Sequence, residues 1–379
     1  MNIKSHMRYK ILFISSWFPN KLEPTNGNFV QRHAETVSLL HDVEILHAIG
    51  DSGQKETHIF VDRNINGLRT LIVYYKNTRN PLLNFARRMK AYQKGFAELQ
   101  RPDLIHANVL HNSMLFAVYL KKKLNIPFVV TEHWSGFLQI NRRKLSKIQL
   151  LFAKIIAGNA EFILPVSKYL FNDLKKLGFK TKLEVVENVV DTALFTADNE
   201  REGVFKFLHI SNLITLKNPD KIIGVAMKLA REYPDFELHI GGDGDVESLD
   251  EIIRNNKAEN YIKTFLRLPL TEVAGKMRSC NCFVLFSDYE NFPCVLLETL
   301  SSGTPAIATA VGGIPEIITP QNGILISNSE QELYNSMKKV LDNKVNFQSP
   351  EDLHQFVEDR FSKKIIAKKF DQIYRRILE

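Results

Sequence analysis

Two acidic residues eight positions apart, Glu290 and Glu298, interrupt the largely apolar stretch YENFPCVLLETLSSGTP. A carboxylate in an apolar environment is costly unless a protein group pairs with it or a ligand binds it. Pro293 favours a first helical turn and Gly303 the end of a helix, so a helix is expected between them. The free N–H groups at its start form an anion site that suits a phosphate, with Glu290 beside it. Glu298 would lie about two turns along, within reach of sugar hydroxyls.

Apolar strands alternate with amphipathic helices along the chain, a pattern that predicts parallel sheets covered on both faces. We expect an α/β fold with two Rossmann-like domains, 1–185 and 186–361, whose parallel sheets face a central cleft. A helix at 362–379, basic like the first domain, is expected to pack back on that domain. Ligands in such folds bind beyond the carboxyl ends of the strands. Strands are expected at 10–16, 42–48, 103–107, 127–133, 161–167, 205–211, 236–242, 282–287 and 305–310, and helices at 29–40, 84–96, 140–158 and 219–233.

Composition is that of an ordinary globular protein, with 379 residues, 44% hydrophobic and 24% charged. No stretch approaches about 18 uncharged apolar residues, so no membrane-spanning helix is expected. The early stretch RYKILFISSWF predicts a first buried strand rather than a signal peptide, because Pro19, Asn20 and Lys21 follow it where a small-residue cleavage site would be needed. The natural start lies at Met1 or at Met7, and both stay open.

Charge is divided unevenly along the chain. Residues 1–185 carry 28 Lys and Arg against 13 Asp and Glu, whereas residues 186–361 carry 16 against 27. The tail at 362–379 carries 6 against 2. This division indicates that the first domain meets something anionic.

The stretch ENFPCVLLETLSSGTPAIA resembles the E-x7-E signature of retaining glycosyltransferases of family 4, which have the GT-B fold. VGGIPEII follows it as in that family, and ISNLITLKNPD is similar to the first loop of the family's C-terminal domain. PDLIHAN, VVTEHW and ILPVSKYL match landmarks of its N-terminal domain. A lone E-x7-E is a weak signal, but this ordered set covers nearly the whole chain. The resemblance implies that 1–185 binds the acceptor and 186–361 the nucleotide-sugar donor.

The resemblance also implies roles for single residues. Glu290 lies against the donor sugar, Glu298 binds the ribose, and N–H groups near Val295 and Leu296 meet the pyrophosphate. The alternative is a helix-start acid and a buried acid without a ligand. The implied catalytic residues are Glu290, Lys217 and His133, and the implied donor-binding residues are Gly27, Ser211, Asn212, Asn291, Phe292, Pro293, Val295, Leu296 and Glu298.

Lys217 matches the family lysine that neutralises the donor pyrophosphate, a leaving group that gains negative charge. Many relatives have arginine at the place of Asn212, so leaving-group stabilisation rests more on Lys217. Gly27 matches a loop glycine that approaches the donor phosphate, and His133 a histidine near the donor sugar. A surface lysine, an ordinary turn and a core histidine are the respective alternatives. His106 has a placement similar to that of His133, with weaker support.

Two short patterns are compatible with metal binding. Asp243 and Asp245 form a D-x-D that could hold a metal on the donor phosphates, but a glycine-rich turn after a strand is favoured. Cys280 and Cys282 form a C-x-C without a second pair or a histidine cluster, which favours packing. The odd total of three cysteines, with Cys294, indicates a reducing compartment. The resemblance implies that neither a metal nor another cofactor is needed.

The implied reaction moves a sugar from a nucleotide sugar, UDP- or GDP-linked, to an acceptor hydroxyl with retention at the anomeric carbon. Base contacts in this family are largely backbone, here near Leu266 to Leu270. The implied setting is bacterial cell-surface polysaccharide or lipopolysaccharide biosynthesis on a glycan or lipid-linked acceptor. The basic amphipathic stretches 84–96 and 140–158 could hold a cytoplasmic enzyme on the anionic inner face of the plasma membrane. Helices with an apolar side in the core and a solvated basic face are the alternative.

Two rival functions stay open. A non-hydrolysing sugar-nucleotide epimerase uses the same two-domain architecture, although this E-x7-E context is not expected in it. The basic first domain is also compatible with a protein that binds anionic membranes or nucleic acid. No module of stacking aromatic and basic residues is evident, so nucleic acid is not the expected partner.

Overall fold

The computed structural model describes residues 7–197 and 201–379. Within these two stretches, no helix combines the length and the apolar character needed to cross a membrane. The six residues before Met7, on which the choice between two natural starts depends, lie outside the described part of the chain.

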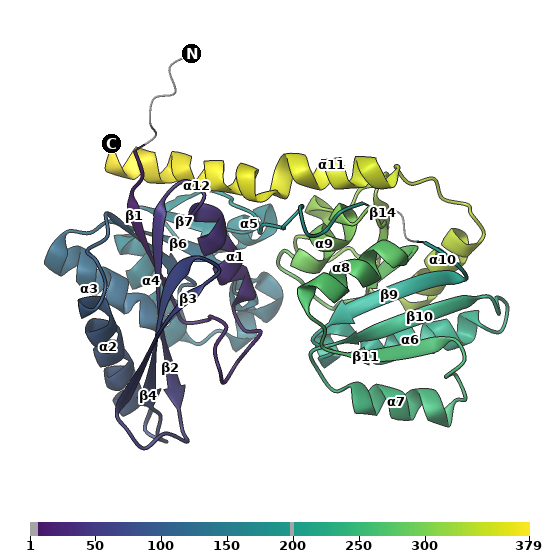
Figure 1. Cartoon of the computed structure of the whole chain (residues 1–379), viewed down its shortest axis with the longest axis horizontal. Helices are drawn as coiled ribbons and strands as arrows, with labels where there is room; N and C mark the ends of the chain where they lie inside the picture. The colour runs from purple at the N-terminus through teal and green to yellow at the C-terminus, as the bar shows by residue number, and fades with distance from the viewer. Residues whose placement is uncertain (1–6, 198–200) are drawn as a thin grey trace, which may run out of the picture. The chain divides into compact units, whose positions relative to one another are not determined.

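The chain folds into two compact units (Figure 1). Unit 1 comprises Met1–Val189 together with Lys364–Glu379, and unit 2 comprises Val190–Lys363. These bounds lie within a few residues of the ranges expected from the sequence. The binding roles assigned to the two domains stay predictions.

Unit 1 contains an eight-stranded sheet in the order β3-β4-β2-β1-β5-β6-β7-β8. All neighbouring strands are parallel except β3 and β4, which are antiparallel. The strands are β1 (Lys10–Ser15), β2 (Asp42–Asp51), β3 (His58–Ile65), β4 (Leu68–Lys76), β5 (Leu104–Asn108), β6 (Phe128–Glu132), β7 (Phe162–Pro165) and β8 (Lys182–Leu183). The helices are α1 (Asn28–Val37), α2 (Pro81–Ala97), α3 (Leu115–Leu124), α4 (Lys147–Asn159), α5 (Lys168–Lys176) and α12 (Lys363–Leu378).

Alternating side chains of β2 and β4 assign helices to the two faces of this sheet. Ile45 and Tyr74 belong to a buried core that also contains side chains of α1 and α12. Leu46 and Val73 point the other way, where a Cβ on Gly95 of α2 would meet both of them. Neighbouring residues of a strand face opposite sides, so both faces are covered and the strands are apolar throughout.

The β3–β4 hairpin was not predicted from the sequence. Asn66 and Gly67 join the strands with φ values of 51° and 85°, and Ile65 pairs with Leu68 across the turn. An Asn-Gly turn with two positive φ values matches the twist of an antiparallel hairpin. This Asn-Gly pair between apolar runs is the sequence signal that would have identified the hairpin.

Helix α12 comes from the end of the chain and packs into unit 1. Ile366, Phe370 and Tyr374 are fully buried in the same core as the first strand. His106, in the middle of β5, is buried between Tyr374 and Thr131, with ring nitrogens 2.5 Å and 2.6 Å from their hydroxyl oxygens. The apolar side of α12 therefore completes the core on one face of the sheet, and His106 is a core histidine.

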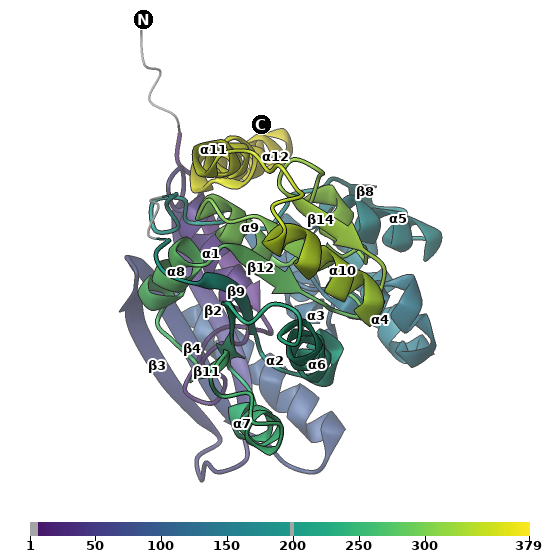
Figure 2. The same ribbon diagram turned by 90° about the vertical axis from the view of Figure 1, so that its right-hand side faces the viewer.

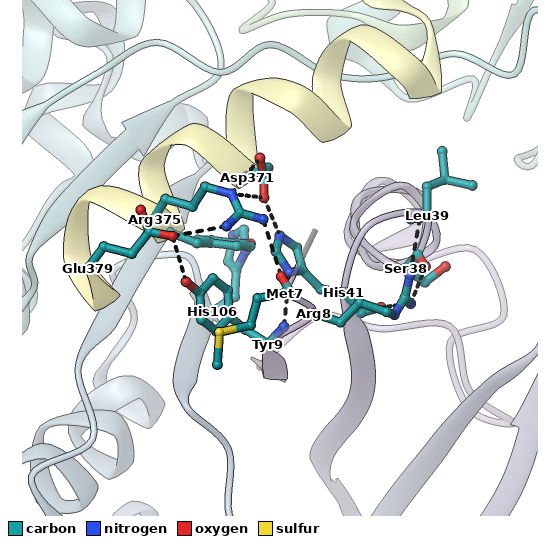
Figure 3. Close-up of polar contacts among 11 residues, drawn as sticks. Met7, Arg8, Tyr9, Ser38, Leu39, His41, His106, Asp371, Arg375 and Glu379 are labelled. Atoms are coloured by element: carbon teal, nitrogen blue, oxygen red, sulfur yellow. Dashed lines mark hydrogen bonds and ion pairs between the residues drawn. The ribbon is translucent and has the colours of Figure 1, made fainter. Parts of the chain in front are cut away.

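Polar contacts fasten the last turns of α12 to the start of the chain (Figure 3). Within the helix, Arg375 forms ion pairs with Asp371 and Glu379. Asp371 Oδ1 lies 3.2 Å from His41 Nε2, and the Tyr9 hydroxyl donates to Glu379 over 3.0 Å. The charged side chains of Asp371, Arg375 and Glu379 are partly exposed, so the apolar contacts supply most of the packing energy.

The helix predicted over 140–158 is wrong in its first third. Residues Gln139–Lys144 form a 3₁₀ segment, and α4 begins only at Lys147. Ser146 caps α4: its side chain accepts from the Gln149 N–H, and the Gln149 side chain accepts from the Ser146 N–H. This capping box fixes a helix start that the apolar pattern alone did not indicate.

Unit 2 contains a six-stranded sheet in the order β11-β10-β9-β12-β13-β14, and all neighbouring pairs are parallel. The strands are β9 (Phe205–Ser211), β10 (Phe236–Gly242), β11 (Ile262–Leu266), β12 (Cys282–Leu285), β13 (Ala306–Thr309) and β14 (Gly323–Ile326). The helices are α6 (Pro219–Leu229), α7 (Val246–Asn255), α8 (Leu270–Ser279), α9 (Cys294–Ser301), α10 (Glu330–Leu341) and α11 (Pro350–Phe361). Helices α6, α7 and α10 share one core with the sheet, and α8 and α9 lie on its other face (Figure 2).

Candidate active site

The sheet of unit 2 changes direction between β9 and β12. From β9 the chain builds outward through β10 and β11, then returns to place β12 on the other side of β9 and continues through β13 and β14. In open parallel sheets, ligands bind beyond the carboxyl ends of the strands at such a switch point. The loops that follow these two strands carry most of the predicted donor-site residues.

Lys217, after β9, and Glu290, after β12, form an ion pair between Lys217 Nζ and Glu290 Oε1. The Ser287 hydroxyl donates a second hydrogen bond of 2.8 Å to the same carboxylate oxygen. The two charged side chains are only 16% and 10% exposed. Charges buried to this degree need a partner. The two residues lie 73 positions apart in the sequence, and the loops bring them together.

Asn218 holds these two loops together. It adopts a left-handed conformation with φ 48° at the start of α6, and its amide donates to the Phe286 carbonyl (3.0 Å) and to Asp288 Oδ1 (2.7 Å). The Asp288 N–H donates to the Leu216 carbonyl over 2.9 Å. Burial acts to raise the pKa of Asp288, but hydrogen bonds from Asn218 and Asn328 outweigh it and lower that pKa. Asp288 therefore stays ionised and keeps the loops joined.

Gly312 closes the other side of the Glu290 loop, and the sequence reasoning did not single it out. It has φ +56°, and a Cβ placed on it would lie 1.6 Å from the Glu290 carbonyl oxygen. The next residue, Gly313, donates its N–H to the Asn291 carbonyl over 3.0 Å. Only glycine allows both this conformation and this approach. The Gly-Gly pair within VGGIPEII was the available signal.

Helix α9 begins directly after this loop, with Pro293 at its N-cap and no side-chain hydrogen bond to the cap. Of the first N–H groups, that of Leu296 donates to the Pro293 carbonyl over 3.2 Å. The start of α9 thus carries a positive partial charge that no acidic side chain of the first turn offsets. Val295 is half-buried, and Glu298 is 6% exposed on the buried side of the helix. Phe292, 4% exposed, packs its ring 5.7 Å from that of Phe361.

Ser211 ends β9 and orders the turn after it. Its hydroxyl accepts from the Leu213 N–H (3.0 Å) and lies 2.8 Å from His209 Nε2. Burial lowers the pKa of His209 to about 4, so this imidazole is neutral and its Nδ1 donates to the Val284 carbonyl over 2.8 Å. Asn212 is exposed, and its side-chain amide makes no hydrogen bond with the described residues.

The D-x-D and C-x-C patterns have structural roles in unit 2. Asp245 caps α7 and accepts from the Ser248 N–H over 3.1 Å. Gly244, between the two aspartates, lies so close to the Asn212 carbonyl oxygen that a Cβ there would be 2.3 Å from it. Cys280 and Cys282 are buried, and burial raises the pKa of both thiols. The described residues contain no cluster of three or more His, Cys, Asp or Glu arranged for a metal ion.

Two family matches together span residues 28–360. Residues 191–360 match the family described as Glycosyl transferases group 1, and residues 28–194 match Glycosyltransferase Family 4. The chain belongs to the group 1 glycosyltransferases. It is therefore an enzyme that transfers sugars.

Known relatives of this glycosyltransferase cover much or all of its length. An uncharacterised glycosyltransferase of Methanocaldococcus jannaschii is 29% identical over 66% of this chain and 68% of its own length. The putative teichuronic acid biosynthesis glycosyltransferase TuaC of Bacillus subtilis is 24% identical over 97% of this chain and 98% of its own. The solved structure of HepE from Anabaena with UDP and glucose has 18% identity and a TM-score of 0.76, covering 97% of this chain and all of that one. Two parallel-sheet α/β units with this likeness have the GT-B fold.

In unit 1 of the glycosyltransferase, Gly27 lies two residues before Phe29, and the His133 ring packs against the ring of Phe29. Gly27 caps α1 with φ +74°, and a Cβ on it would lie 2.3 Å from the Trp17 carbonyl oxygen. The close contact with Trp17, just after β1, is therefore enough to require a glycine at position 27, without any role in donor binding. His133 follows β6, with its ring centroid 4.2 Å from that of Phe29 and 5.3 Å from that of His33. Burial, reinforced by His33 and His106, lowers the pKa of His133 well below its usual value, so it is a neutral imidazole.

A pocket of about 420 Å³ lies beyond the carboxyl ends of β1, β2 and β4, and the sequence reasoning missed it. Trp17, Tyr75 and Arg88 are among its lining residues, with Ser16 and Asn112. Arg88 donates to the Tyr75 hydroxyl (3.0 Å) and to Asn112 Oδ1 (3.2 Å). The Ser16 hydroxyl has no hydrogen-bond partner among the described residues. Aromatic faces beside amide, hydroxyl and guanidinium groups suit a hydroxylated ring.

Proposed function

We propose that this glycosyltransferase moves a sugar from a nucleotide sugar to an acceptor hydroxyl with retention at the anomeric carbon. The observation that carries the proposal is the Lys217–Glu290 pair beside the uncapped start of α9, at the switch point of a parallel sheet. A fixed cation and a row of helix amides provide favourable partners for a diphosphate. They also stabilise the charge that develops as the nucleoside diphosphate leaves.

On binding, the diphosphate would compete with Glu290 for the ammonium of Lys217. Glu290 would then be released toward the donor sugar, where its carboxylate can accept hydrogen bonds from ring hydroxyls. The backbone of Asn291 and Phe292 would meet the same hydroxyls, and Glu298 would hold the ribose. The ion pair thus keeps both charges satisfied before the donor arrives.

The base of the nucleotide is proposed to lie beyond the carboxyl ends of β10 and β11. Leu266 ends β11 and is 69% exposed, and Leu270, at the start of α8, is 48% exposed. Exposed apolar side chains at this edge suit the flat face of a base. HepE is described with UDP and glucose, which supports a UDP-sugar as the first donor to test.

The acceptor is proposed to be a glycan held by the unit 1 pocket around Trp17 and Arg88. TuaC, similar along nearly its full length, is described as a putative enzyme of teichuronic acid biosynthesis. That description supports a role in cell-surface polysaccharide assembly, with the glycan on a lipid carrier. His133 and Gly27 would border the donor sugar and its phosphate, as in the family the chain resembles.

Thermal unfolding with UDP, UDP-glucose, GDP-mannose and ADP-glucose tests the donor site, since a ligand raises the unfolding temperature according to its affinity. We expect one nucleotide series to stabilise the protein and Lys217→Met to weaken it by about 10- to 100-fold, the size of a lost charge-assisted hydrogen bond. Lys263→Met removes an exposed lysine of the same unit and is the control. Equal effects of the two substitutions, or no stabilisation by any nucleotide, would refute the site.

Product analysis tests both the retention of stereochemistry and the epimerase alternative. Proton NMR of the linkage formed from an α-linked donor should give an α-linked product, and added EDTA should leave the rate unchanged. An inverted anomer would disprove retention. Conversion of the donor alone into its epimer, without an acceptor, would instead favour the epimerase.

A further inference from the structure

Helix α4 carries exposed apolar side chains in the direction opposite to its buried side. Ala153, Ile156 and Ala157 face the interior of unit 1. Ile148 and Leu151 are 66% and 57% exposed, and Ile155 is 40% exposed. Positions i, i+3 and i+7 share one helix face. This stripe therefore points away from the core that α4 covers.

Five lysines and arginines lie on α4 or in the 3₁₀ segment just before it. Between Glu132 and Glu161 the chain has no acidic residue. All the basic residues of that stretch are exposed, and none forms a hydrogen bond or ion pair with the part of the chain that the structure describes. They are Arg142, Arg143, Lys144, Lys147 and Lys154. Together with Ile148, Leu151 and Ile155 they form what we call the α4 surface.

Lys147 and Lys154 border the stripe, because they lie four residues before and three residues after Leu151 on the helix. Long basic side chains can lay their methylene stems along apolar surface and extend their charges beyond it. The remaining three cations come from the 3₁₀ segment Gln139–Lys144, just before the helix. Ile140 in that segment is also 60% exposed.

Helix α2 differs, although its sequence is also basic and amphipathic. Its buried residues are Ala91, Tyr92 and Gly95. The exposed positions along its length include Ala86, Lys90, Gln93, Lys94 and Ala97, with large apolar side chains exposed only at its start, Leu82 and Leu83. This is the solvated basic face of an ordinary surface helix. The structure thus distinguishes α2 from α4, although the sequence predicted the same basic amphipathic character for both.

We propose that the α4 surface lies flat on an anionic lipid bilayer, with its apolar stripe at the level of the headgroups and its cations on lipid phosphates. An exposed apolar face bordered by basic residues is the composition of helices that bind at membrane interfaces. Anionic lipids attract each basic residue near the surface, and the attraction weakens with salt. The proposal deepens the proposed function and rests on it for the lipid-linked acceptor.

Two other occupants fit the charge pattern less well. A second copy of the chain, joined by a two-fold axis, would place this surface against itself and bring five cations against five. A nucleic acid would satisfy the cations and could stack on Arg142 and Arg143, but it would leave the isoleucine and leucine stripe without an apolar partner. A bilayer satisfies both the charge and the aliphatic stripe.

Vesicle flotation tests the proposal with lipids of known composition. We expect binding to phosphatidylcholine vesicles containing about a third phosphatidylglycerol, reduced by high salt, and little binding to phosphatidylcholine alone. Lys147→Gln with Lys154→Gln should lower the partition coefficient roughly 20-fold at low salt, from about fivefold per cation. Lys90→Gln with Lys94→Gln makes the same charge change on α2 and should have a much smaller effect.

The apolar stripe is tested in parallel. Ile148→Ser with Leu151→Ser should lower the binding that persists at high salt by about tenfold or more. Leu82→Ser with Leu83→Ser is the matched control on α2. The exposed positions make normal folding expected, and equal unfolding temperatures check it. Absence of binding to anionic vesicles, or equal losses from the α2 and α4 changes, would overturn the proposal.

The remaining outcomes identify the rival occupants. A dimer that light scattering detects and that Ile148→Ser with Leu151→Ser dissociates would replace the bilayer with a second copy. Binding to DNA that exceeds vesicle binding at equal salt would replace it with nucleic acid. Stabilisation by UDP-sugars is measured on the same variants, so a failed donor site and a failed membrane surface are distinguished.

Discussion

Each unit has a doubly wound sheet, parallel in unit 2 and parallel except for β3 in unit 1, and the two carry different chemistry where the strand order reverses. In unit 2 the loops after β9 and β12 meet around a lysine–glutamate ion pair, beside the start of α9. In unit 1 the pocket beyond β1 is lined by Trp17, Tyr75 and Arg88. The same topology thus presents a fixed cation and helix amides in one unit and aromatic and polar groups in the other. Topology sets the position of a site, and the loops set what it can bind.

Charge and histidine content separate the units further. Unit 1 holds 33 Lys and Arg against 16 Asp and Glu, whereas unit 2 holds 17 against 26. Burial also lowers the pKa of one histidine in unit 2, His209. In unit 1 burial lowers the pKa of His33, His41, His47, His58, His106, His111 and His133. Unit 1 is therefore the unit that acid should destabilise first.

Of the changes considered, acidification should produce the largest difference in stability between the two units. Burial lowers the pKa of His33, His47 and His111 to about 4. Between about pH 6.5 and 4 the unfolded state then binds more protons, and the free energy of unfolding falls as pH falls. Between pH 7.5 and pH 5, these three histidines together lower the free energy of unfolding by about 6 kcal/mol. Burial raises the pKa of Glu132 to about 7, which has the opposite sign and offsets about 2 kcal/mol.

Tryptophan fluorescence measures this difference, because both tryptophans, Trp17 and Trp134, belong to unit 1. The midpoint of the urea transition followed by fluorescence should be lower at pH 5 than at pH 7.5. At pH 5 this transition should also precede the part of the far-UV circular dichroism transition that belongs to unit 2. A fluorescence midpoint that does not move between the two pH values would contradict the assignment of the acid-sensitive histidines to unit 1.

Removing a buried ring of α12 should destabilise unit 1 by the next largest amount. Phe370 is fully buried, 5.2 Å from the ring of His33 and 5.1 Å from that of His106. Phe370→Ala should lower the free energy of unfolding by about 3–5 kcal/mol, again measured by tryptophan fluorescence. Phe60→Ala, at a ring 42% exposed in β3, is the control and should cost less than about 1 kcal/mol. Similar losses would mean that α12 adds little to unit 1.

Gly312→Ala should have the smallest effect on stability and a specific effect on the donor site. The new Cβ must displace the Glu290 carbonyl, so the loop that holds the Lys217–Glu290 pair shifts. We expect UDP affinity to fall about tenfold or more, with a stability loss of about 1–3 kcal/mol. Gly67→Ala shares the positive φ, at +85°, but meets nothing within 4 Å. It should leave UDP binding unchanged, and an equal loss in both variants would disconnect Gly312 from the site.

Much of the fold followed from local patterns. The strands β1 and β12 were predicted because a strand buried on both faces is apolar along nearly all of its length. The β3–β4 hairpin was missed because Asp62, Arg63 and Asn64 interrupt the apolar run of β3, although Asn66-Gly67 marked the turn. The single helix over 140–158 was wrong because the apolar spacing continued through a 3₁₀ segment that ends before Ser146.

The candidate site was predictable only in part. The signature around Glu290 identified the start of α9 and the residues after β12, and the loop after β9 identified Lys217. The ion pair between Lys217 and Glu290 was not foreseen, because a contact across 73 residues depends on which strands are neighbours. Gly312 and the unit 1 pocket were missed for the same reason. Their roles appear only when loops from different strands lie side by side.

By itself the sequence determined the parallel α/β class and the glycosyltransferase family, and it supplied Lys217 and Glu290 as candidate charged groups of a donor site. These depend on residue type and on short spacings, which periodicity and motif order preserve. Tertiary structure decided which charges pair, which histidines are neutral and which of two basic helices leaves its apolar side in solvent. Those properties depend on burial and on contacts between distant segments, and no local pattern in a single chain contains them.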